Sequence, residues 1–307
     1  MKDIHVQAIR VHAYGGSDQL RLEEVPVPAP GPGEVLINIV ASGVNPIDWK
    51  TREGMMQKPL PYIPGVEAAG VVVALGEGVT DKKVGEAVYG AVDGSYAACA
   101  VAPAERLFHK PIHLSFEEAA ACGGAKTAWG ALFDVGKLAK GQRVLIHAGA
   151  GGVGHFAVQL AYNAGAYVIA TSAAENTDFV KSLGASEVID YTAAPFETQT
   201  GPVDVLLDTV GGDTLDRSYQ LVKPGGVLLC LVQQPSPEKA AAAGIRAVWA
   251  GTKTLHAMQE VAKLLDKDLI RPSVRKVFAP LSAAAAAQDY SQLGGPGRGK
   301  IVLKIEE

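Results

Sequence analysis

Short runs of β-branched and apolar residues, separated by turn signals, occupy about the first hundred residues. The runs are Val6–Tyr14, Leu20–Val25, Val35–Val40 and Gly70–Leu75. Glycine-rich and proline-rich stretches at 15–18, 26–33 and 76–78 separate or follow them, and such stretches are typical of tight turns. Because almost no helical periodicity is present, this region predicts a barrel-like or sandwich β domain.

From Ser115 onward, strand-like and helix-like segments alternate. Ser115, with Glu117 and Glu118 behind it, is typical of a helix N-terminus, where a hydroxyl and carboxylates satisfy free N–H groups. The predicted strands are 143–148, 167–171, 187–190, 203–208, 227–232 and 245–249, and the predicted helices are 153–163, 175–183, 213–221 and 253–265. Strands joined by helical crossovers predict an α/β fold with a doubly wound parallel sheet.

Strand-like segments return after Arg271-Pro272, at Val274–Phe278 and Lys300–Ile305, with a short helix expected over 283–287. Since both ends of the chain have β character, we predict one discontinuous domain and one inserted domain. The discontinuous β domain comprises residues 1–113 and 272–307, and the parallel-sheet domain comprises residues 114–271.

Composition agrees with two domains and narrows the classes of partner. The chain has 307 residues, and about 150 residues per domain is usual. Hydrophobic residues make up 48% and charged residues 20%, with a net charge of −4, which excludes whole-chain disorder and disfavours nucleic acid or an anionic membrane as partner. Three cysteines without ligand spacing and the lack of a long apolar run lead us to expect a reducing, cytoplasmic setting.

A glycine-rich loop carries the first chemical signal. The predicted strand 143–148 is followed by Gly149-Ala150-Gly151-Gly152-Val153-Gly154 and then by an amphipathic helix. This is G-x-G-x-x-G in its strand–turn–helix setting, where the glycines allow a tight turn, close approach to a pyrophosphate and close helix packing. The loop therefore predicts dinucleotide binding.

The end of the next strand bears on the choice between NAD(H) and NADP(H). It ends with Ala170-Thr171-Ser172, without the carboxylate that would bind a ribose 2′-hydroxyl. This favours NADPH as the cofactor. NADH remains the alternative, because residues 172–177 contain no Arg or Lys for a 2′-phosphate and Glu175 stands near the ribose position.

The sequence resembles the zinc-independent, quinone oxidoreductase-like (zeta-crystallin-like) branch of the medium-chain dehydrogenase/reductases. The resemblance extends over nearly the whole chain and rests on 43–50, 64–70, 127–129, the 149–154 loop, 183–191, 208–212 and 298–302. It implies a Rossmann domain inserted into a GroES-like catalytic domain. It also implies a homodimer.

The resemblance further implies which residues contact the cofactor. Thr127 and the loop Gly149, Gly151, Gly152, Val153 and Gly154 would contact it directly. Ser172 and Tyr191 would lie near the 2′-phosphate, and Asn176 stands where some relatives have a phosphate-binding lysine. Val210, Leu231 and Val232 would lie along the nicotinamide, and Lys300 matches a position close to the cofactor.

Zinc enzymes of the same superfamily bind a catalytic metal through two Cys and one His. The matching positions here are Asn45, Val66 and Gly123, none of which offers a thiolate or an imidazole. A structural zinc needs four clustered cysteines, one more than the chain's three. We therefore predict no metal site.

Without a Lewis acid, activated acceptors are favoured over simple alcohols and ketones. We expect NADPH-dependent reduction of quinones or α,β-unsaturated carbonyls, with a small-molecule substrate. Asn45 is the first candidate for a polar active-site group, followed by Lys50 and Tyr62. An NADPH-binding protein with a structural or regulatory role and no relevant catalysis is the alternative.

Overall fold

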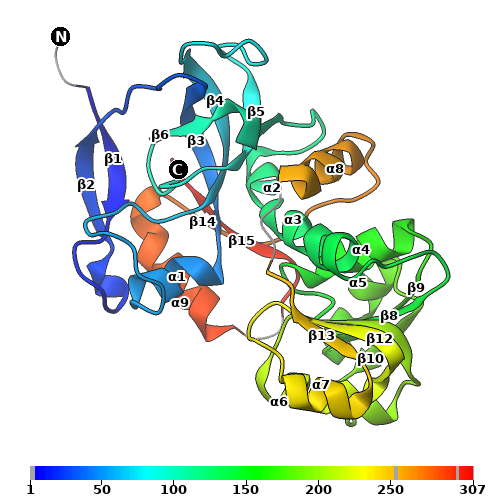
Figure 1. Cartoon of the computed structure of the whole chain (residues 1–307). Helices are drawn as coiled ribbons and strands as arrows, with labels where there is room; N and C mark the ends of the chain where they lie inside the picture. The colour runs from blue at the N-terminus through cyan, green and yellow to red at the C-terminus, as the bar shows by residue number, and fades with distance from the viewer. Residues whose placement is uncertain (1–3, 252–254, 295–296, 307) are drawn as a thin grey trace. The chain divides into compact units, whose positions relative to one another are not determined.

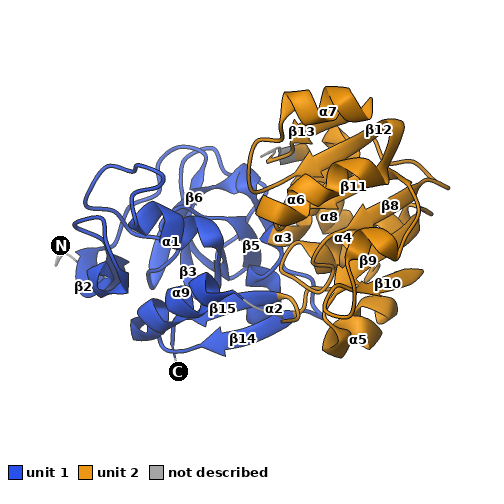
Figure 2. Ribbon diagram, turned by 90° about the horizontal axis from the view of Figure 1, so that it is seen from below, with its two compact units in different colours: residues 1–123, 274–295, 300–307 blue, residues 124–273, 296–299 orange. Residues whose placement is uncertain are grey.

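The computed structural model describes residues 4–251, 255–294 and 297–306, which divide into two compact units (Figures 1 and 2). The first comprises 1–123, 274–295 and 300–307, and the second comprises 124–273 and 296–299. The first unit includes residues 114–123, which the sequence placed in the parallel-sheet domain, because helix α2 packs against β3, β4 and β15.

The first unit is built around a seven-stranded sheet. Its strands follow the order β14-β15-β3-β4-β5-β7, with β6 also paired to β3, and β1 and β2 form a separate hairpin. The strands are β1 (His5–Arg10), β2 (Arg21–Pro26), β3 (Glu34–Val44), β4 (Glu67–Leu75), β5 (Ala87–Ala91), β6 (Cys99–Pro103), β7 (Leu107–His109), β14 (Val274–Phe278) and β15 (Lys300–Lys304). The helices are α1 (Pro46–Arg52), α2 (Phe116–Ala120) and α9 (Ala284–Leu293).

Strand β15 ties the last segment of the chain to the middle of this sheet. It pairs antiparallel with β3, so that Ile301 lies opposite Val44, and parallel with β14. Valine and isoleucine from β3, β4 and β15 form a common buried core with Leu281 and Ala284 near the start of α9. The β domain is therefore assembled from both ends of the described chain.

The second unit is the predicted doubly wound sheet. Its six strands are all parallel and follow the order β10-β9-β8-β11-β12-β13. They are β8 (Arg143–Ile146), β9 (Tyr167–Ser172), β10 (Glu187–Asp190), β11 (Val203–Asp208), β12 (Val222–Cys230) and β13 (Arg246–Trp249). The helices are α3 (Gly123–Trp129), α4 (Gly154–Asn163), α5 (Thr177–Ser182), α6 (Gly212–Ser218), α7 (Pro237–Ala243) and α8 (Leu255–Asp266). The fold class is confirmed.

Several predicted boundaries were wrong. The strand expected over Val6–Tyr14 ends at Arg10, because Val11 leaves the hairpin to bridge Tyr62. The helix expected over 283–287 continues to Leu293, and helix α1 lies in a region where almost no helical pattern was visible. Lys253, the expected start of the last Rossmann helix, lies outside the described residues.

Within the described residues, no helix has both the length and the apolar content that crossing a membrane requires.

Candidate active site and cofactor-binding edge

The loop between β8 and α4 leaves almost no space for side chains. A Cβ added to Gly154 would lie 2.0 Å from the carbonyl oxygen of Ala148, and one added to Gly149 would lie 2.7 Å from Cβ of Ala170. The positive φ in this turn belongs to Ala148, at 53°. Gly149 and Gly154 therefore allow the loop and the start of α4 to pack closely against Ala170 and Ala148. The N-terminus of α4 adjoins this loop, and a helix N-terminus favours the binding of an anion.

The candidate cofactor residues of the second unit gather at one edge of its sheet. The strand order reverses direction between β8 and β11, and ligands of such sheets bind at the carboxyl ends of strands beside that reversal. At these ends lie the glycine loop, buried Ser172, half-buried Leu231, and the exposed Tyr191, Val210 and Val232. Thr127 is half-buried on α3 of the same unit.

Arg298 supplies a cation at this edge. Its guanidinium donates to Oδ1 of Asn176 at 3.0 Å and to the carbonyl oxygen of Glu175 at 2.8 Å. Asn176 is buried, whereas Arg298 is exposed. Sequence reasoning assigned no role to Arg298, although the 298–302 segment contributed to the resemblance. Because 122 residues separate the pair, no local pattern predicts the contact.

A second group of polar side chains lies within the first unit. Lys300, on β15, donates to Oε1 of Glu67 at 2.7 Å and to Oδ1 of Asn45. The amide nitrogen of Asn45 donates to the same Glu67 oxygen at 2.8 Å. Lys300 and Glu67 are buried and Asn45 is half-buried. We call Asn45, Glu67 and Lys300 the lysine cluster.

Two glycines enclose the Glu67 carboxylate. A Cβ built on Gly43 would lie 2.1 Å from its Oε1, and one built on Gly123 would lie 1.6 Å from its Oε2. Both positions must therefore lack a side chain for Glu67 to adopt this conformation. Sequence reasoning missed Glu67, because its importance comes from partners on other elements.

Asp48 interacts electrostatically with Glu67 and Lys300 of the lysine cluster. Its carboxylate accepts from the backbone N–H of Asn45 at 2.8 Å, at the start of α1, and from the hydroxyl of Tyr96 at 3.2 Å. Burial raises the pKa of Asp48 to about 7, against the lowering effect of its hydrogen bond from Asn45. The nearby negative charge of Glu67 also raises this pKa, and Lys300 lowers it.

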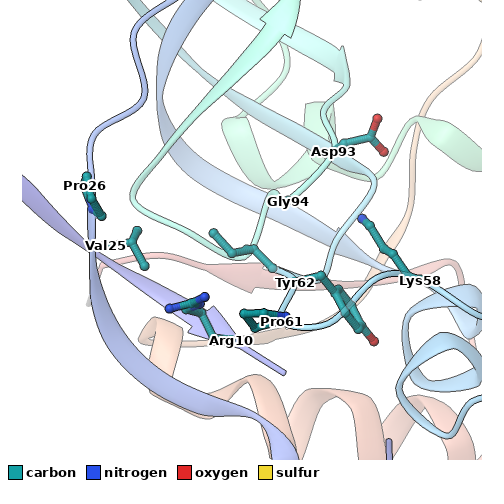
Figure 3. A pocket seen from close by; sticks show the side chains of 9 residues that line it. Arg10, Val25, Pro26, Lys58, Pro61, Tyr62, Asp93 and Gly94 are labelled. Atoms are coloured by element: carbon teal, nitrogen blue, oxygen red, sulfur yellow. The ribbon is translucent and has the colours of Figure 1, made fainter. Parts of the chain in front are cut away.

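Among the described residues, the other two candidate catalytic residues make no hydrogen bond to the lysine cluster. Lys50 places its ammonium 5.5 Å from the ring centroid of Trp49. Tyr62 lines a surface hollow of about 470 Å³, with Arg10, Lys58 and Asp93 (Figure 3). Burial raises the pKa of Tyr62 to about 12, and its buried hydroxyl has no hydrogen-bond partner among the described residues.

Elsewhere in the second unit, His147 is buried and hydrogen-bonds to Ser218 at 2.9 Å and to Thr171 at 3.2 Å. Burial lowers its pKa to about 4, which keeps the ring neutral.

In the described ranges, no three His, Cys, Asp or Glu side chains are grouped so as to hold a metal ion.

Comparisons with known families agree with this architecture. Residues 31–112 match the alcohol dehydrogenase GroES-like domain, and residues 183–303 match the zinc-binding dehydrogenase family. Among solved structures, the quinone oxidoreductase from Coxiella burnetii is 32% identical, with a TM-score of 0.89 over 99% of this chain and 100% of its own. A mycobacterial protein solved in complex with NADPH is 30% identical, with a TM-score of 0.87 over 97% and 99%.

Comparison with curated proteins also finds oxidoreductases among the similar sequences. The synaptic vesicle membrane protein VAT-1 homolog of Rattus norvegicus is 38% identical over 69% of this chain, and the match spans only 56% of that protein's length. The 2-haloacrylate reductase of Burkholderia sp is 35% identical over 97% of this chain and 98% of its own. The quinone oxidoreductase of Mus musculus is 32% identical over 98% of both. The chain therefore belongs to the medium-chain dehydrogenase/reductase family of oxidoreductases, among its quinone oxidoreductase-like members.

Proposed function

We propose that this protein is an NADPH-dependent oxidoreductase that delivers hydride to a small quinone or α,β-unsaturated carbonyl acceptor. Two relatives that match over nearly their full length, a quinone oxidoreductase and a 2-haloacrylate reductase, support the acceptor class. Both kinds of acceptor are electron-poor, so hydride addition gives an anion that is delocalised over the product.

The observation that carries the choice of NADPH is the position of Arg298. The edge beyond β9 has no carboxylate at Ser172 and places the Arg298 guanidinium against Asn176. A ribose 2′-phosphate placed there would meet a cation and amide and hydroxyl donors, whereas NADH would leave that cation without an anionic partner.

We also propose that the reaction needs no zinc. The match to a zinc-binding dehydrogenase family prompts the question of whether this chain could hold the metal. Asn45 offers an amide already bonded to Glu67 and Lys300, Val66 offers no donor, and a side chain at Gly123 would overlap Glu67. These residues do not fit a tetrahedral site of nitrogen and sulfur ligands.

The test is a cofactor-consumption screen with NADPH and NADH against quinones, 2-alkenals, 2-alkenones and saturated ketones, with and without EDTA. We expect NADPH consumption with the activated acceptors, unaffected by EDTA. Ketone reduction that is lost on chelation would contradict the proposal. NADPH binding without turnover of any acceptor would instead favour the non-catalytic alternative.

Cofactor preference is tested by Arg298→Gln. Loss of a charge-assisted contact to phosphate is expected to raise the KM for NADPH roughly 10–100-fold and to leave the KM for NADH nearly unchanged. Arg246→Gln is the matched control, because Arg246 lies at the opposite, amino-terminal end of strand β13. Equal effects of Arg298→Gln on both cofactors would contradict a phosphate role.

A further inference from the structure

The resemblance implies that the lysine cluster lies at or beside the positions of the catalytic metal ligands in zinc-dependent members of the superfamily. Of the matching positions, Asn45 belongs to the cluster, Val66 adjoins Glu67 in the chain, and Gly123 faces the Glu67 carboxylate. The Lys300 ammonium makes its hydrogen bonds to Asn45 and Glu67. The positive charge beside Asn45 and Glu67 is therefore supplied by a side chain of the protein, the Lys300 ammonium.

The geometry holds this cation in one place. A lysine ammonium is ordinarily mobile at the end of four rotatable bonds. Here two acceptors from different elements, Glu67 on β4 and Asn45 before α1, fix the nitrogen, and the amide of Asn45 binds Glu67 in turn. Gly43 and Gly123, which lack side chains, leave room for the carboxylate in this conformation. The arrangement is therefore preorganised.

The ammonium also retains capacity for a further acceptor. It carries three N–H bonds, and the described residues accept two of them. Lys300 remains 6% exposed, so a small part of its surface is accessible to solvent. A fixed donor with positive charge and a remaining N–H suits an oxygen that becomes negative during a reaction.

We propose that the Lys300 ammonium, held by Glu67 and Asn45, replaces a catalytic metal and binds the oxyanion that forms when hydride adds to an enone acceptor. This inference rests on the proposed function. Lys300 is then a catalytic residue, whereas Glu67 and Asn45 are positioning residues whose polar atoms are already bonded within the cluster.

The chemistry balances without another reactant. With NADPH as the hydride donor of the proposed function, a C–H bond of its nicotinamide would break as a C–H bond forms at the β-carbon of the acceptor, and NADP⁺ would remain. The C=C π electrons move to give an enolate oxygen that accepts a hydrogen bond from Lys300. Water then gives a proton to the α-carbon and leaves as hydroxide, and the carbonyl returns. Lys300 keeps its own protons throughout. A quinone acceptor needs this support less, because its product anion is delocalised over an aromatic ring.

The difference between acceptors supplies the test. We expect Lys300→Met to lower kcat with a 2-alkenone by about 10²–10³-fold and kcat with a quinone by less than about tenfold. Lys300→Arg, which keeps the charge with altered geometry, should recover part of the alkenone activity. Lys304→Met on the same strand is the matched control, with both activities unchanged. Equal losses with both acceptors would indicate a structural role and overturn the proposal.

A second measurement does not depend on turnover. Binding of 4-nitrophenol, followed by absorbance in the presence of NADP⁺, reports whether the site stabilises a phenolate. We expect wild type, but not Lys300→Met, to favour the bound phenolate. If Lys300→Met unfolds, Glu67→Gln/Lys300→Met removes the unpaired carboxylate as well and serves instead.

The two proposals fail differently. Wild type that consumes NADPH with neither acceptor, but binds the phenolate in a Lys300-dependent manner, would overturn the proposed function and support the anion-binding role of the cluster. Phenolate binding that is equal in wild type and variant would overturn that role.

Discussion

At the scale of the residue, Asp48 carries the clearest dependence on pH. Its folded pKa of about 7 exceeds the ordinary value of 3.8, because burial penalises the ionised form. Between these two values the folded state holds a proton that the unfolded state has released. The contribution of Asp48 to stability is therefore largest below about pH 4 and falls as pH rises to about 7, by about 1.4 kcal/mol per pH unit at most.

We expect Asp48→Asn to remove this dependence. The amide oxygen can still accept from the Asn45 backbone N–H, but the side chain no longer ionises. The measurement is urea unfolding of both proteins at several values between pH 4 and pH 8, with wild type losing stability relative to the variant as pH rises. His147 has the opposite effect, because its lowered pKa makes the folded state less stable as pH falls below about 6.5. Subtracting the unfolding free energy of wild type from that of the variant at each pH cancels this effect, since both proteins contain His147. A difference that does not vary with pH would show that Asp48 ionises normally in the fold.

At the scale of the element, the β8–loop–α4 unit depends on Gly154. A methyl group there would meet the Ala148 carbonyl at 2.0 Å, so α4 would have to move away from the loop. We expect Gly154→Ala to destabilise the protein by about 1–3 kcal/mol and to weaken NADPH binding, measured by denaturant unfolding and by fluorescence titration.

The matched control is Gly201→Ala. A Cβ at Gly201 meets no atom within 4 Å, so its effect should stay within about 0.5 kcal/mol. If both variants behaved alike, crowding at the loop would not be what requires glycine at 154.

The same unit shows how much the sequence alone could reveal. The strand–loop–helix and the six parallel strands were predictable, because their hydrophobic periods and turn glycines are local signals. Strands β5 and β6 were not predicted, since Ala87–Ala91 and Cys99–Pro103 are rich in small residues and extend along β4 and β3 through long-range pairing. Arg298 and Glu67 were missed for the same reason, as their partners are distant in the sequence.

At the scale of the whole molecule, the resemblance predicts a homodimer, and β13 offers a place for it. In the described part of the chain β13 is an edge strand, paired only to β12, and its Trp249 is 50% exposed. A strand at the end of a sheet with an exposed aromatic side chain is suited to pairing with another copy.

We expect light scattering on wild type to give about twice the chain mass of 31.9 kDa. We expect Trp249→Glu to shift the protein toward monomer, because the introduced carboxylates would repel each other at the paired edge. Ile112→Glu is the control, because Ile112 is fully exposed in the other unit. A monomeric wild type at micromolar concentration would contradict the prediction, and a dimer insensitive to Trp249→Glu would place the interface elsewhere.

The position of β15 has a consequence for synthesis on the ribosome. Residues 124–273 leave the exit tunnel before Lys300 does, so the whole parallel sheet is available to fold while the older β domain still lacks β14 and β15. Until then Glu67 has no ammonium beside it, and β3 has an open side where Ile301 will pair with Val44. Residues 1–123 are thus translated before the parallel sheet but completed after it, and the nascent chain exposes an unpaired strand that chaperones can recognise.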